Sequence, residues 1–167
     1  NALPSSDYPE TAVFRDTRLV TFLRRPTDQP PVRFYERLEP AVFVLRLVPG
    51  MRADIIPLLV PHYRALVLES FGVGGLPGGE HGEMFAALHR WCESGRLAVF
   101  TTQVPHEGCD LAVYEVGRAV GELPGVLEAR DLTPEAVAVK LMWALGQTED
   151  REKAARLFET PIEYDIM

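Results

Sequence analysis

Two segments of the chain contain most of the residues whose types and spacing could do chemistry. The first is a glycine-rich stretch with Gly72, Gly74, Gly75, Gly78 and Gly79. Backbone N–H groups of such a loop can hold an anion, and the pattern has a superficial likeness to a nucleotide-binding loop. A Gly-x-Gly-x-x-Gly fingerprint would need glycine at position 77, which is Pro77, and no Gly-Lys-Ser/Thr follows. We therefore interpret this stretch as a shaped structural turn.

The second segment, 101–110, is polar and ends in His106, Glu107, Cys109 and Asp110. A Cys–His pair could act as a nucleophile and its base. Neighbours in sequence rarely face each other as such a pair requires, so we favour a surface loop in which Asp110 caps the next helix.

Metal chemistry has little support in the pattern of the four histidines, His62, His81, His89 and His106. His81 and His89 are spaced two helical turns apart, with Glu83 nearby. However, the sequence contains no His-Glu-x-x-His and no Cys-x-x-Cys. The prediction is a solvated helix face, with no metal and no other cofactor.

Alternating strands and helices must position these segments. Short apolar runs at 41–45, 65–68 and 97–100 are typical of strands buried on both faces. Helices are predicted over 53–59, 82–94, 111–121, 134–145 and 148–158. For the fourth of these, Thr133 can cap the start, Pro134 suits the first position, and Gly146 is expected to end it.

This alternation predicts an α/β fold, a parallel sheet of about four strands with helices on both faces, Rossmann-like or flavodoxin-like, in three layers. Function in such sheets lies beyond the carboxyl ends of the strands. Both chemical segments fall at that edge. Residues 1–40 are rich in proline and are predicted to be a linker with short strands at 19–23 and 32–35. The opening Asn1-Ala2 is consistent with a cloning scar.

Composition excludes several classes of protein. Of 167 residues, 47% are hydrophobic and 25% charged, which rules out disorder for most of the chain. Two cysteines exclude a disulfide-rich secreted scaffold and make the cytoplasm the default. The net charge of −7 disfavours direct contact with nucleic acid. No stretch is apolar for long enough to suggest a membrane span.

Three segments, taken together and in order, resemble the C-terminal half of cytoplasmic-type (type I) L-asparaginases. They are 65–77 (ALVLESFGVGGLP), 101–117 (TTQVPHEGCDLAVYEVG) and 131–146 (DLTPEAVAVKLMWALG). The segment 48–51 (VPGM) also fits, and the resemblance covers roughly residues 41–160. The same half occurs in the asparaginase-like D subunit of glutamyl-tRNA(Gln) amidotransferase.

The resemblance implies a two-domain amidohydrolase of which this chain is one half. In that family a threonine in a Thr-Gly-Gly-Thr turn of the N-terminal half is the nucleophile. This chain contains no Thr-Gly-Gly, and Thr27-Asp28 lacks the family's surrounding sequence. We therefore expect the chain alone to be inactive. Residues 1–40 are assigned to the linker and 41–167 to the asparaginase C-terminal domain.

The resemblance also implies a homodimer in which this half contributes to the partner's active site. Tyr114 matches a tyrosine that approaches that site across the interface, where its phenol could donate a hydrogen bond. The alternative is a half-buried interface tyrosine. Gly72, Gly74, Thr102 and Gln103 are predicted at the edge facing substrate or effector.

Some positions depart from the family. Where certain bacterial relatives hold a regulatory asparagine with Arg and Cys, this chain has Glu69 and Val104. Gly75 stands where asparagine is common. These differences argue against the same effector site.

The sequence thus favours the C-terminal domain of an enzyme that converts L-asparagine and water to aspartate and ammonia. One alternative is the D subunit of the tRNA-dependent amidotransferase. A second is a non-catalytic α/β interaction or sensor domain.

Overall fold

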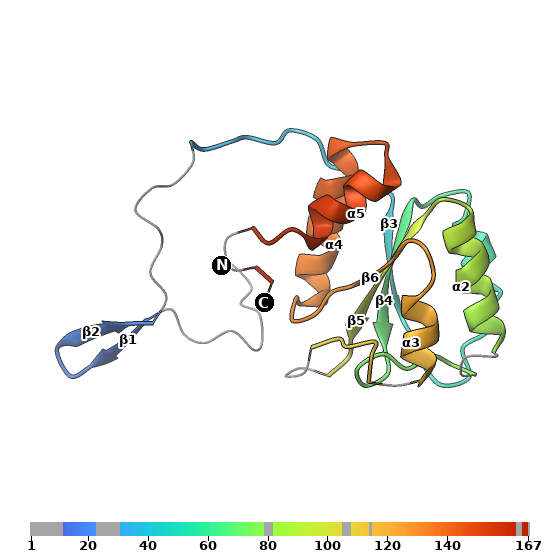
Figure 1. The fold of residues 1–167 in the computed structure, drawn as a ribbon, viewed down its shortest axis with the longest axis horizontal. Coiled ribbons are helices and arrows are strands. Elements are labelled where there is room, and N and C mark those ends of the chain that lie inside the picture. The colour runs from blue at the N-terminus through green and yellow to red at the C-terminus, as the bar shows by residue number, and fades with distance from the viewer. Residues whose placement is uncertain are drawn as a thin grey trace.

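A four-stranded parallel sheet forms the centre of the chain, in the order β3-β4-β5-β6. The computed structural model describes residues 12–22, 31–78, 82–104, 108–113, 115–162 and 165–166. The strands are β3 (Val42–Arg46), β4 (Ala65–Ser70), β5 (Leu97–Thr102) and β6 (Val126–Glu128). The predicted α/β fold with a parallel sheet is confirmed (Figure 1).

Helices cover both faces of this sheet, which makes three layers (Figure 1). One face packs against α1 (Ile55–Leu59), α2 (Glu83–Glu93) and α3 (Glu115–Gly121), and the other against α4 (Pro134–Gln147) and α5 (Arg151–Glu159). Side chains of β4 alternate between the two cores: Leu66 and Leu68 belong to the first, Ala65 and Val67 to the second. Burial on both faces explains why the strand sequences read as continuous apolar runs.

The start of α4 follows the predicted local signals. The Thr133 hydroxyl oxygen accepts a hydrogen bond from the Ala136 N–H at 3.4 Å, and Pro134 occupies the first helical position. A proline there loses no helical hydrogen bond, because the first N–H groups of a helix have no partner within it.

The predicted end of α4 at Gly146 is wrong, because the helix continues to Gln147. The glycine instead allows another segment of the chain to pack closely against the helix. A Cβ at Gly146 would lie 2.5 Å from the carbonyl oxygen of Arg37. The segment 35–39 runs along the helix here: the Glu39 N–H donates to the Met142 carbonyl oxygen at 2.9 Å, and the Tyr35 ring packs edge-on against Trp143.

Other boundaries also differ from the prediction. Residues 32–35 form no strand, since their backbone pairs with no strand in the described part of the chain. The predicted strand 19–23 is β2 (Arg18–Thr21), which pairs antiparallel with the unpredicted β1 (Ala12–Arg15) in a hairpin apart from the sheet (Figure 1). The last helix begins at Arg151, after Asp150 accepts a hydrogen bond from the Lys153 N–H, and not at 148.

The third predicted helix also begins later than expected. The Asp110 carboxylate accepts the Ala112 N–H at 2.9 Å, and the Val113 N–H donates to the Asp110 carbonyl oxygen at 3.4 Å. These bonds make a separate turn, and α3 starts only at Glu115. Asp110 therefore caps this turn rather than the helix.

Within the ranges given above, the structure contains no helix that is both long enough and apolar enough to cross a membrane.

Candidate functional site

Three neighbouring strands present one side chain each to a hollow of about 300 Å³ at the carboxyl edge of the sheet. Arg46 on β3, Glu69 on β4 and Thr101 on β5 are directly adjacent in the strand register. The start of α4, including Thr133 and Glu135, closes the hollow on one side. This is the edge at which open α/β sheets bind ligands.

The charges in this hollow are partly matched. The Arg46 guanidinium lies 3.7 Å from the Glu69 carboxylate, whose side chain is only 16% exposed. The Thr101 hydroxyl is fully buried and has no hydrogen-bond partner among the side chains and backbone that the structure describes.

The glycine loop after β4 closes on itself. The Gly74 and Gly75 N–H groups both donate to the Phe71 carbonyl oxygen, at 3.2 and 2.8 Å, and the Phe71 N–H donates back to the Gly75 carbonyl oxygen at 3.1 Å. These two glycine N–H groups are therefore not available to a phosphate. The geometry agrees with a structural turn.

The predicted edge residues Gly72, Thr102 and Gln103 are brought together. The Thr102 hydroxyl donates to the Gly72 carbonyl oxygen and accepts the Val104 N–H at 3.0 Å. The Gln103 side-chain amide donates to two carbonyl oxygens, of Leu47 at 2.7 Å and of Glu69 at 2.8 Å. Thr102 and Gln103 thus brace the loops that follow three strands. Their contact with a substrate stays a prediction.

A second hollow, of about 500 Å³, lies on the opposite face of the sheet between the glycine loop and the loop after β3. Its walls are largely apolar and include Met51, Phe71, Leu76 and Met84. The carboxyl edge is therefore indented on both faces.

Cys109 is not placed for catalysis. Its side chain is 4% exposed, and its thiol donates to the Val73 carbonyl oxygen at 3.5 Å. Burial, with the nearby Glu128 and Asp110 carboxylates, raises the pKa of the Cys109 thiol to about 12. Burial raises the pKa of the Cys92 thiol to about 11. Both cysteines are therefore protonated near neutral pH, whereas a nucleophile must be a thiolate.

We expect iodoacetamide at pH 8 to modify neither cysteine rapidly in the folded chain. A thiol with a pKa of about 12 is thiolate only to about one part in 10⁴ at this pH, and burial excludes the reagent as well. Mass spectrometry of a labelling time course measures the rate, with the chain in denaturant as the control. Fast labelling of Cys109 before unfolding would contradict the buried-thiol assignment.

Leu111 joins the glycine loop to α3. Its side chain is 2% exposed, and its backbone approaches Gly117 so closely that a Cβ there would lie 2.5 Å from the Leu111 carbonyl oxygen. The same helix offers a comparison, since a Cβ at Gly121 would lie 3.7 Å from the Leu111 side chain, an ordinary contact.

We expect Gly117→Ala to destabilise the chain by about 1–3 kcal/mol, because a backbone atom cannot move aside as a flexible side chain can. Gly121→Ala should cause no loss of stability, since alanine favours helix by up to about 1 kcal/mol over glycine. Urea unfolding of both variants measures the difference. Equal stabilities would mean that the Leu111 loop does not hold α3 as described.

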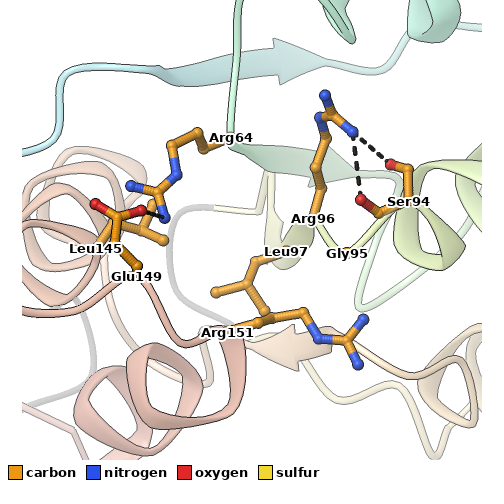
Figure 2. Close-up of a pocket in the computed structure, with 8 residues that line it drawn as sticks. All are labelled: Arg64, Ser94, Gly95, Arg96, Leu97, Leu145, Glu149 and Arg151. Carbon is orange, nitrogen blue, oxygen red and sulfur yellow. Dashed lines mark hydrogen bonds and ion pairs between the residues drawn. The ribbon is translucent and has the colours of Figure 1, made fainter.

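A third hollow, of about 220 Å³, lies at the opposite, amino end of the sheet and is lined by Arg64, Arg96 and Arg151 (Figure 2). These guanidinium groups have structural partners. Arg96 donates to the Val60 carbonyl oxygen at 2.8 Å and to Ser94, Arg151 donates to the Cys92 carbonyl oxygen at 3.1 Å, and Arg64 pairs with Glu149 at 2.9 Å. Arg96 thus caps the carboxyl ends of α1 and α2, and Arg151 ties the start of α5 to α2.

Several predicted residues lie outside the described residues: Tyr114, His81, His106 and Glu107, as well as Thr27-Asp28. His89 forms an ordinary helix-surface pair, with its Nδ1 3.2 Å from Glu93. Across the described ranges, no group of three or more His, Cys, Asp or Glu side chains is arranged to hold a metal ion.

Sequence reasoning missed two residues at this edge, Leu111 and Glu128. Burial, followed by the Asp110 charge, raises the pKa of Glu128, while the nearby Leu111 N–H lowers it. A glutamate within the apolar stretch 126–129 was the available signal. It could not be used because β6 itself was not predicted.

Comparison with known proteins identifies related sequences. The model of the glutaminase/asparaginase C-terminal domain family matches residues 41–158. An L-asparaginase from Thermococcus kodakarensis is 36% identical over 99% of this chain and 50% of its own length. The D subunit of glutamyl-tRNA(Gln) amidotransferase from Metallosphaera sedula is 33% identical over 93% of this chain and 35% of its own length. The chain thus spans half or less of these relatives.

Solved structures give the same picture of the fold. The thermostable L-asparaginase from Thermococcus kodakarensis superposes with a TM-score of 0.84 and 32% identity, over 96% of this chain and 48% of that one. L-asparaginase I from Vibrio cholerae has a TM-score of 0.81 over 98% of this chain and 49% of that one. At 22% identity this second likeness concerns the fold alone.

Proposed function

Because the chain belongs to the glutaminase/asparaginase C-terminal domain family, we propose that it is the C-terminal domain of a type I L-asparaginase, which converts L-asparagine and water to aspartate and ammonia. The observation that carries this proposal is the L-asparaginase relative that matches 99% of the chain at 36% identity. The L-asparaginase structure with a TM-score of 0.84 supports it.

In this proposal residues 41–167 form the domain and residues 1–40 are the linker to a catalytic half. That half supplies the threonine nucleophile, since the present chain has no Thr-Gly-Gly. The start of the family match at residue 41 supports the boundary.

The contribution of this half is a rigid edge for the active site. Thr102 and Gln103 brace the loops after β3, β4 and β5, and the glycine loop is closed by its own hydrogen bonds. Pre-organised groups of this kind position a substrate without an ordering cost during the reaction. We assign Gly72, Gly74, Thr102 and Gln103 to the substrate-facing edge and Tyr114 to the active site of the neighbouring protomer.

A homodimer follows from that assignment of Tyr114. Large apolar side chains exposed beside α4 support an interface: Phe34 is 88% exposed and Val139 60%. The resemblance further implies a cytoplasmic enzyme without metal or cofactor. The net charge of −7 supports a domain that does not itself contact nucleic acid.

The second candidate is the amidotransferase's D subunit, in which released ammonia would pass to a partner protein. Relatives with that name, 33% and 31% identical over 93% of this chain, favour it. Each of these matches leaves 65% of the relative's own length outside the aligned region, whereas the match to the L-asparaginase leaves 50% outside it.

The complete protein decides between these functions. We expect it to release ammonia from L-asparagine without any other protein or RNA, at a rate in the ordinary enzymatic range of about 1–10³ s⁻¹. Activity that appears only with a partner protein and glutamyl-tRNA would favour the amidotransferase. No ammonia release under either condition would leave the non-catalytic interaction or sensor domain as the remaining hypothesis.

A further inference from the structure

Two polar side chains lie side by side in the wall of the hollow of about 300 Å³ at the carboxyl edge. Side chains two residues apart on a strand point to the same face of the sheet. Val67 on β4 and Val99 on β5 belong to the core under α4 and α5. Glu69 and Thr101 stand two residues further along these strands and are partners in the register. Both therefore project to the α4 face, where the hollow lies.

The Thr101 hydroxyl has an unusual environment. Its side chain is fully buried, yet the hydroxyl forms no hydrogen bond to any group in the described ranges. Nearly all buried polar groups in native proteins are paired, because an unpaired one has lost its hydrogen bonds to water without replacement. The backbone here is held in place, since the Ser70 hydroxyl donates to the Thr101 carbonyl oxygen at 2.8 Å. A ligand group in the hollow would pair with this hydroxyl.

The Glu69 carboxylate has only a weak partner. The Arg46 guanidinium lies 3.7 Å away, beyond hydrogen-bond distance, and its side chain is 63% exposed against 16% for Glu69. Such a pair contributes little, because water screens the exposed charge. The Glu69 carbonyl oxygen accepts the Leu47 N–H at 3.0 Å and the Gln103 side-chain amide at 2.8 Å. Glu69 thus presents a positioned carboxylate that Arg46 only partly neutralises.

The charge of the lining favours a positive ligand. Among the described residues that line the hollow, the carboxylates belong to Glu69, Asp131 and Glu135, and the positive charge belongs to Arg46. The N-terminus of α4 adds the positive end of a helix dipole, about half a charge. The Thr133 side chain caps this end, and Glu135 lies in its first turn. Negative charge therefore prevails in the hollow.

We propose that this hollow binds a small primary amine in its ammonium form. The ammonium group donates to the Glu69 carboxylate and to the Thr101 hydroxyl oxygen, and the exposed Arg46 side chain moves aside. The alkyl part packs against Leu132 and Val104, which also line the hollow. A volume of about 300 Å³ is at the lower end of small-molecule pockets. This binding property does not depend on the proposed amide hydrolysis.

The test uses three probes of nearly the same shape: propylammonium chloride, n-propanol and sodium propionate, which are positive, neutral and negative. Each is titrated into the ¹⁵N-labelled chain at pH 7 and equal ionic strength. The amide signals of residues 69–70, 101–104 and 131–133 are followed by NMR. L-asparagine is titrated in the same way, because it combines an ammonium group with a carboxylate.

We expect propylammonium to shift these signals with a Kd on the order of 1 mM, since so small a ligand makes few contacts. n-Propanol lacks the charge, and the carboxylates of the lining repel propionate and L-asparagine. All three should therefore bind at least about tenfold more weakly.

Two substitutions remove the proposed partners with little change of shape. Glu69→Gln should weaken propylammonium binding at least about tenfold, because it removes the charge. Thr101→Val should weaken it about three- to tenfold without lowering the melting temperature, because the hydroxyl has no partner within the described fold. Glu122→Gln, at an exposed carboxylate just after α3, is the matched control and should change neither quantity.

Arg46→Gln tests the sign of the bound charge. It should tighten propylammonium binding about three- to tenfold, because the guanidinium competes for Glu69. A site that held an anion through Arg46 and the start of α4 would respond in the opposite way, with loss of propionate binding.

Several results would overturn the proposal. Absence of propylammonium binding up to 100-fold the expected Kd would exclude the site, and equal binding of n-propanol would reduce it to apolar contact. Tighter binding of propionate or L-asparagine would make it an anion or amino-acid site. Full affinity in both Glu69→Gln and Thr101→Val would place the amine elsewhere. A lower melting temperature of Thr101→Val would mean that the hydroxyl is already paired. Ammonia release from L-asparagine is measured separately, so failure of the proposed function is distinguishable from each of these results.

Discussion

The 167-residue chain by itself should release no ammonia from L-asparagine above a protein-free control. The family to which it belongs is expected to use a threonine of a Thr-Gly-Gly-Thr turn as nucleophile, and this chain contains no Thr-Gly-Gly. Cys92 and Cys109 cannot substitute, because burial raises their pKa values to about 11 and 12. Loss of a nucleophile lowers turnover on the order of 10⁶-fold.

An ammonia assay at high protein concentration measures this activity, and the complete protein, purified in the same way, is the positive control. Turnover by the chain alone that survives additional purification, and so is not due to a contaminating host enzyme, would contradict the assignment. It would also require a nucleophile elsewhere in the sequence.

Replacing Tyr114 with phenylalanine in the complete protein should lower kcat more than it raises KM. If the phenol donates a hydrogen bond made mainly in the transition state, its loss costs on the order of tenfold to a few hundredfold, about 1.4–3.5 kcal/mol. The ring remains, so packing at an interface is preserved. Steady-state kinetics measures the effect, and sedimentation measures whether the proposed dimer is present in both wild type and variant.

Tyr35→Phe is the matched control for this experiment. The Tyr35 ring packs edge-on against Trp143 with centroids 5.3 Å apart, and phenylalanine keeps that contact. This variant should be nearly silent. An intact dimer with unchanged kcat in Tyr114→Phe would move Tyr114 from the active site to the interface.

The sequence by itself determined the features that depend on local patterns. Apolar runs at 41–45, 65–68 and 97–100 correspond to β3, β4 and β5, because a strand buried on both faces has to be apolar throughout. Thr133 and Pro134 mark the start of α4 through contacts within one helical turn. The family was recognisable because three such segments keep their order.

Only the tertiary structure decided the remaining features. β6 has three residues and becomes a strand by pairing with β5, more than twenty residues earlier in the chain. Gly146 is a helix stop by local rules, yet it lies inside α4, where its lack of a side chain leaves room for the backbone of Arg37, distant in sequence. The sequence predicted that Cys109 lies in a surface loop, but its side chain is buried and its thiol donates to the Val73 carbonyl oxygen.

The candidate site likewise has one feature that the sequence predicted, its location, and one that only the structure showed, its internal geometry. Its location at the carboxyl edge follows from strand order, which alternating strands and helices already imply. Its internal geometry depends on contacts between segments far apart in the chain, such as Gln103 with Leu47 and Asp110 with Val73. Local propensity carries no record of such partners. The sequence therefore indicated which residues lie at the edge, whereas the hydrogen bonds that hold its loops were visible only in the fold.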